Sequence, residues 1–156
     1  MADDDKALND WSRSTFLAQQ ELAQDNVAAA KEHYIEALNA AIGLRNSNPL
    51  PYAQTQVALA SVCLLVDDAE GAICFLLDVL PIYEKYYPRS HYKMLELYHL
   101  IANAHHRYGL WLEAKHWYEL TLENMGQFRF DQADKKVVVD NYAALLELIE
   151  DYRRAA

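Results

Sequence analysis

Apolar positions along the chain recur with the spacing of amphipathic helices, and polar segments interrupt them at regular places. The short interruptions are Asp25-Asn26, Asp67-Asp68 and Tyr108-Gly109. The longer ones are Asn46-Ser47-Asn48-Pro49, Pro88-Arg89-Ser90 and the segment from Gly126 onward, where Pro and Gly cannot continue a helix. The pattern predicts seven helices, near residues 8–24, 27–45, 50–66, 69–87, 92–108, 111–127 and 133–153. They group into three hairpins, the repeats at about 8–45, 50–87 and 92–127, followed by a final capping helix at 133–153.

Small residues recur at a fixed interval of 42 positions. One set is Ala30, Ala72 and Ala114, and a second is Ala18, Ala60, Ala102 and Ala144. Two helices that cross closely leave room for only a small side chain between them, and bulky neighbours fill the flanking grooves. Because one hairpin cannot cover its own apolar face, we expect successive hairpins to stack and share a core. The interval therefore predicts an all-α solenoid.

The third unit carries the clearest motif. It reads Tyr98-x-x-Ile101-Ala102-x-x-His105-x-x-x-Gly109-x-Trp111-x-x-Ala114-x-x-x-Tyr118-x-x-Thr121-Leu122, and it resembles a tetratricopeptide repeat. The departures are His105, where that family prefers Tyr, and Thr121, where it prefers Ala. The resemblance covers residues of about 12 to 153 and implies a right-handed α-solenoid. We expect His105 to be a hydrogen-bonded core side chain.

The usual period of the tetratricopeptide family is 34 residues. The period of 42 with longer helices is similar to the kinesin light chain variety of that family. His91 lies eleven residues before Ala102, as the His of that variety's His-Pro signature does, but Tyr92 replaces the Pro. Asn141 matches one of its groove asparagines. The slots used by chaperone-binding members for a carboxylate clamp do not match, so we expect no such clamp; they hold Thr15, Gln19, Ala58, Glu96 and Leu100.

Charge limits the classes of partner. The 156 residues contain 14 Lys and Arg against 23 Asp and Glu, a formal charge of −9. A phosphate backbone or an anionic lipid surface selects basic faces, so we expect no nucleic-acid and no membrane partner. The acidic start MADDDK leads into no apolar segment, which favours a cytoplasmic protein with residues 1–7 as a disordered acidic tail and residues 8–153 as a single domain.

The two cysteines give no metal or redox motif. Cys63 and Cys74 are eleven positions apart, which fits neither a zinc pattern nor a CxxC pair. We interpret both as buried small hydrophobic side chains. We expect no metal and no cofactor.

A solenoid of this kind uses a concave wall, lined by the first helix of each hairpin, to hold a partner. The resemblance and helical spacing together predict a groove for an extended or helical peptide, with an acidic group of that peptide near Arg107. Its predicted residues are Gln19, Gln54, Val57, Ser61, His99, Asn103, His106, Arg107 and Asn141. The function that follows is a non-catalytic protein-interaction adaptor or scaffold.

Three alternatives stay open at this point. In the first alternative, the groove face of the third hairpin binds no partner, because it is solvated or covered by the chain's own last helix. The apolar stripe of that helix mediates homodimer or end-to-end contacts, which would make the protein an assembly subunit. The histidines at 91, 99, 105 and 106 form a metal-binding or enzymatic module, although the sequence has no HExxH, GxSxG, P-loop or dinucleotide fingerprint.

Overall fold

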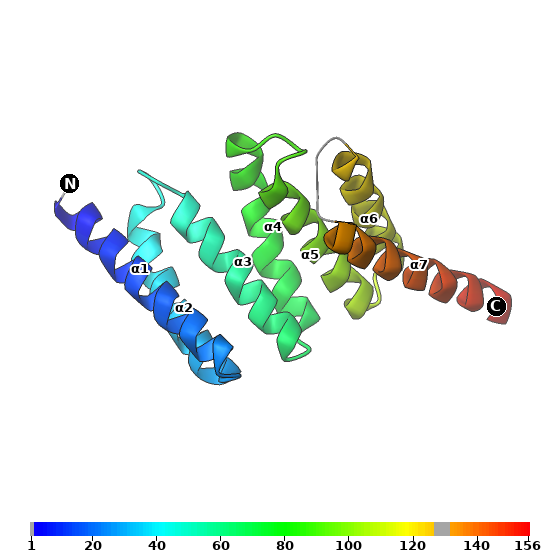
Figure 1. Ribbon diagram of the computed structural model, residues 1–156, viewed down its shortest axis with the longest axis horizontal. Coiled ribbons are helices and arrows are strands. Elements are labelled where there is room, and N and C mark those ends of the chain that lie inside the picture. The colour runs from blue at the N-terminus through cyan, green and yellow to red at the C-terminus, as the bar shows by residue number, and fades with distance from the viewer. Residues whose placement is uncertain (1, 127–131) are drawn as a thin grey trace. The chain divides into compact units, whose positions relative to one another are not determined.

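The computed structural model describes residues 2–126 and 132–156, and in these ranges it contains seven α-helices and no strand (Figure 1). The helices are α1 (Ala2–Ala23), α2 (Val27–Leu44), α3 (Leu50–Leu65), α4 (Ala69–Tyr86), α5 (Tyr92–Tyr108), α6 (Trp111–Met125) and α7 (Gln132–Ala155). The all-α class is confirmed, and the predicted end of the third repeat at residue 127 lies outside the described residues. None of these helices is both long and apolar enough to cross a membrane.

The predicted acidic tail at residues 1–7 is wrong for the residues that the structure describes. Residues 2–7 form the first turns of α1, and Asp3, Asp4 and Asp5 lie in the first turn. Carboxylates at a helix N-terminus interact favourably with the helix dipole and with the unpaired N–H groups there. The three aspartates therefore support the start of α1, although a run of like charge by itself is typical of a solvated tail.

Packing divides the chain into two compact units, Met1–Tyr83 and Glu84–Ala156, where the sequence predicted a single domain over 8–153. The boundary falls inside α4. In an array of hairpins each helix packs mainly on its neighbours in sequence, so the apolar core has no single centre. We describe each unit separately.

The three hairpin turns share one geometry, repeated every 42 residues. Asp25, Asp67 and Gly109 each follow the first helix of a hairpin, and each has a positive φ of 62°, 63° and 91°, respectively. The next residue donates its backbone N–H back to the helix: Asn26 to Glu21 at 2.9 Å, Asp68 to Cys63 at 2.8 Å and Leu110 to His105 at 2.9 Å. A left-handed residue with this return bond is a common helix stop, because it satisfies carbonyls that the helix leaves unpaired.

Two columns of alanines, one on the first and one on the second helix of each hairpin, are buried. Ala30, Ala72 and Ala114 on the second helices are fully buried, and so are Ala18, Ala60 and Ala102 on the first helices. Ala144 on α7 is exposed, in contrast to the column. The reason is that α7 has no following helix in the described chain to pack on that side.

The core of the first unit joins α1, α2 and α3. Ala18, Tyr34, Leu59 and Val62 form a buried cluster, and Phe75 of α4 packs against it. The indole Nε1–H of Trp11 on α1 donates to the Thr55 hydroxyl on α3 at 2.8 Å, which pairs the first helices of two successive hairpins. Cys63 is buried as predicted, but Cys74 is exposed, because it lies on the outer face of α4.

In the second unit α7 packs against α6 and also contacts α5. The Tyr142 hydroxyl on α7 donates to the Glu119 carboxylate on α6 at 2.7 Å, and the Tyr142 ring lies 5.9 Å from the Tyr118 ring. Val138 and Leu145 are the buried anchors of α7. His105 is buried as predicted, with Nδ1 2.8 Å from the Ile101 carbonyl one turn earlier.

Candidate functional site

The predicted groove residues fall into two groups, one in each unit. Gln19 is exposed on α1, while Gln54, Val57 and Ser61 are half-buried on α3. The Ser61 hydroxyl donates to the Val57 carbonyl at 3.1 Å, so its hydrogen is used within its own helix. A groove that continues from this group to the residues of the second unit remains a prediction.

In the second unit, His99 and Asn141 are brought together. The side-chain nitrogen of Asn141 on α7 lies 3.2 Å from Nε2 of His99 on α5, so the amide donates to a neutral imidazole. Burial lowers the pKa of His99 below its ordinary value, and the negative charge of Asp134 opposes that shift. At His99, therefore, the last helix covers part of the predicted groove face.

The remaining predicted residues of α5 are more open. His106 is half-buried, with Nδ1 3.4 Å from the Tyr118 hydroxyl, and burial lowers its pKa. Burial also raises the pKa of Tyr118 to about 12, so its hydroxyl keeps its proton at neutral pH. Asn103 is half-buried and Arg107 is exposed near the end of α5. Asn103, His106 and Arg107 do not line the hollow that contains His99.

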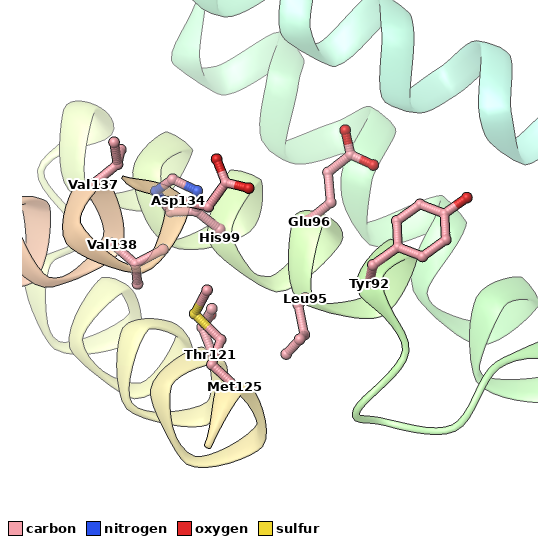
Figure 2. Close-up of a pocket in the computed structure, with 9 residues that line it drawn as sticks. All are labelled: Tyr92, Leu95, Glu96, His99, Thr121, Met125, Asp134, Val137 and Val138. Atoms are coloured by element: carbon pink, nitrogen blue, oxygen red, sulfur yellow. The ribbon is translucent and has the colours of Figure 1, made fainter. Parts of the chain in front are cut away.

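The hollow that contains His99 has a volume of about 400 Å³ and lies where the starts of α5 and α7 meet the end of α6 (Figure 2). This volume is within the range of about 300–1,000 Å³ that is usual for ligand pockets. We call it the α5–α7 pocket. It is lined by Tyr92, Leu95, Glu96 and His99 of α5, Thr121 and Met125 of α6, and Asp134, Val137 and Val138 of α7.

One side of the α5–α7 pocket is apolar. Leu95, Met125 and Val138 are buried, and Figure 2 shows them with Thr121 on the same side of the hollow. The Thr121 hydroxyl donates to the Trp117 carbonyl at 2.7 Å, so it has no hydrogen left to donate to a ligand. This side favours an apolar group, because burying such a group removes apolar surface from water on both partners.

The other side carries two carboxylates. Figure 2 shows Glu96 and Asp134 on the side of the pocket opposite Leu95 and Met125. Both residues are exposed, and no Lys or Arg lines the pocket. Surrounding protein atoms desolvate the Glu96 carboxyl and raise its pKa above the ordinary value, although it keeps contact with solvent, and Lys93 opposes the shift. The polar side is therefore negative.

The sequence predictions missed all pocket residues except His99, although the 42-residue interval held a signal for them. Tyr92, Leu95 and Glu96 lie 42 positions before Asp134, Val137 and Val138. The pocket thus forms between equivalent faces of two first helices. A comparison of the residues at 92, 95 and 96 with those 42 positions later would have pointed to the pocket. The helical spacing along α5 by itself did not.

In residues 2–126 and 132–156, no three His, Cys, Asp or Glu side chains come together in a way that could hold a metal ion. Among the predicted histidines, the rings of His99 and His106 both lie beside the Tyr118 ring, with centroid distances of 6.1 Å and 6.2 Å. His91 has a different role: its Nδ1 accepts the Lys93 backbone N–H at 3.2 Å and caps α5. Its ring stacks between those of Tyr87 and Tyr92.

Comparison with protein-family models and with curated protein sequences found no match for the chain.

Proposed function

We propose that this protein is a non-catalytic, tetratricopeptide-like adaptor that binds a segment of a partner protein and holds it at the α5–α7 pocket. The observation that carries the proposal is an open hollow with buried apolar side chains on one side and two carboxylates on the other. A pocket with an apolar wall and a few convergent polar groups is the usual form of a binding site. The positive φ shared by Asp25, Asp67 and Gly109 at the three turns supports the repeat architecture.

The chemistry of the lining supports binding rather than catalysis. None of the nine lining residues is a Ser, Cys or Lys, and the Thr121 hydroxyl is held by the Trp117 carbonyl. His99 is the one imidazole in the pocket, and its Nε2 accepts from Asn141. A serine, cysteine or lysine nucleophile beside a free base, one common arrangement for covalent catalysis, is therefore not present among these nine residues. We place the adaptor in the cytoplasm, where two free thiols such as Cys63 and Cys74 are usual.

The test is a selection of random displayed peptides against the whole chain, followed by calorimetry on the recovered peptides. Val137 lines the pocket and is 50% exposed, whereas Val139 on the same helix is 43% exposed and lies outside it. Val137→Ser should weaken binding about fivefold, because part of a valine side chain no longer covers the ligand. Val139→Ser is the matched control and should bind as the wild type does. Failure to recover any peptide, or equal binding by both variants, would refute the proposal.

One observation favours a second candidate, an assembly subunit that associates through the outer faces of α6 and α7. Leu112 is 69% exposed there, and Tyr152 and Leu146 are also exposed. Two shallow hollows meet at Leu112, Ile149 and Arg153. Exposed apolar side chains gathered at one place are typical of contact surfaces.

Sedimentation velocity across a range of concentrations tests the second candidate. Self-association that Leu112→Ser abolishes would support it. Leu65 is 64% exposed and belongs to the first unit, so Leu65→Ser removes a similar apolar group elsewhere. A wild-type chain that stays monomeric at all concentrations, or an equal effect of both variants, would exclude assembly through this surface.

A further inference from the structure

The α5–α7 pocket also carries information about the charge of its occupant. Glu96 comes from α5 and Asp134 from α7, and both carboxylates lie on the same side of the hollow (Figure 2). The other lining residues carry no charge. This includes His99, because burial lowers its pKa and favours the neutral ring. The pocket is therefore negative at neutral pH. Both carboxylates are exposed, and no Lys or Arg lines the pocket, so a cationic group of a ligand would meet two negative charges beside an apolar wall.

The apolar wall sets the second requirement. Leu95, Met125 and Val138 are buried and form a surface that a hydrocarbon side chain would cover. Glu96 and Asp134 lie across from it. A ligand that uses both sides therefore needs an apolar residue for the wall and an adjacent residue with a positive charge for the carboxylates. A hollow of about 400 Å³ holds one or two side chains and not a folded domain.

We propose that the α5–α7 pocket selects a partner segment in which a large aliphatic or aromatic side chain stands next to a lysine or arginine, and that it rejects acidic segments. The inference rests on the proposed adaptor function and specifies its partner. The proposed segment differs from the acidic group that the sequence predicted near Arg107, which does not line this pocket. The aliphatic or aromatic group covers Leu95, Met125 and Val138, and the cation pairs with Glu96 and Asp134.

The experiment uses three synthetic peptides on the full chain: one alternates leucine with lysine, and two matched peptides carry glutamine or glutamate in place of lysine. The lysine peptide should bind about tenfold more tightly than the glutamine peptide, since hydrogen bonds between ions are roughly twice as strong as neutral ones. The glutamate peptide should not bind. The preference should decrease at high salt, which screens partly exposed charges.

Pocket variants separate this site from a general attraction to the charge of −9. Glu96→Gln with Asp134→Asn should weaken binding of the lysine peptide about tenfold. The control pair, Glu32→Gln with Glu123→Gln, removes the same charge from exposed positions outside the pocket and should change binding less than about twofold. Glu96→Gln by itself repeats the test if Asp134→Asn, which alters the first turn of α7, destabilises that helix.

The outcomes distinguish this inference from the adaptor proposal. Equal or tighter binding of the glutamate peptide, or equal losses in the pocket and control pairs, overturns the charge preference. If displayed peptides still bind in a manner that depends on Val137 but carry no Lys or Arg, the adaptor function stands and the charge preference is wrong. If no displayed peptide binds at all, both proposals fail.

Discussion

His99 on α5 and Asn141 on α7 lie 42 residues apart in the sequence, and the Asn141 side-chain nitrogen is 3.2 Å from Nε2 of His99. The contact joins α5 to α7, and His99 also lines the α5–α7 pocket. It requires a neutral imidazole that accepts from the amide, because a protonated ring has no acceptor. Proton binding at His99 therefore acts on the packing of α7.

The first prediction follows from the pKa of His99, which burial lowers. The unfolded chain takes up a proton near pH 6.5, whereas the folded chain does so at lower pH, so the unfolded state binds more protons in that interval. The free energy of unfolding should therefore fall as the pH decreases from about 7 through 6.5 towards the folded pKa. Denaturant unfolding between pH 5 and 8 measures this slope.

His99→Gln should reduce that slope, since Gln keeps an acceptor but does not titrate. His116→Gln, on the exposed face of α6, is the control and should leave the slope unchanged. The shift at His106 contributes in the same direction and remains in both variants. Identical slopes in the wild type and His99→Gln would contradict the prediction.

The second prediction contrasts two glycines. Gly109 has φ 91°, a conformation that costs a side-chain-bearing residue about 1–2 kcal/mol, so Gly109→Ala should destabilise the chain by about 1 kcal/mol. Gly43 is helical and a Cβ there meets nothing within 4 Å, so Gly43→Ala should stabilise by about 0.5–1 kcal/mol. Thermal unfolding monitored by circular dichroism compares the two. Shifts of the same sign would show that one backbone assignment is wrong.

The third prediction concerns the alanine columns. Ala30 is fully buried on α2, and extra methylene groups in a packed crossing cost about 1–3 kcal/mol, so Ala30→Leu should destabilise by that amount. Ala28 on the same helix is exposed, and Ala28→Leu should change stability by less than about 0.5 kcal/mol. Urea unfolding measures both variants. A neutral effect of Ala30→Leu would contradict the close crossing.

The fourth prediction concerns the bond between Trp11 and Thr55. Thr55 is buried, and Thr55→Val leaves the indole N–H without its acceptor, which should cost about 1–2 kcal/mol. Trp11→Phe in addition should recover part of that loss, because the unpaired donor is removed as well. A double-mutant cycle in urea provides the coupling energy. Strict additivity of the two changes would mean that the hydrogen bond does not contribute to stability.

Local features could be read from the sequence with few errors. The turns at Asp25, Asp67 and Gly109 were predicted because Asp, Asn and Gly tolerate left-handed backbone and stop helices. The buried columns at Ala30, Ala72 and Ala114 followed from the interval of 42 residues. The errors lie where neighbours in space change the outcome: Ala144 and Cys74 are exposed because nothing in the described chain packs on them.

The candidate site was only partly predictable. Spacing along α5 placed His99, Asn103, His106 and Arg107 on one face, but it could not show that Asn141 of α7 contacts His99. Nor could it bring Glu96 and Asp134 to the same hollow, since that depends on how the starts of two helices lie side by side.

By itself, the sequence determined the helices, their turns and the repeat that relates them, because propensity, capping and apolar period act over a few residues along the chain. Only the tertiary structure decided which equivalent faces meet. It placed Leu95, Met125 and Val138 opposite two carboxylates, and it closed part of the expected groove face against α7. Side chains from separate helices create a pocket, and their mutual positions follow from packing across the core.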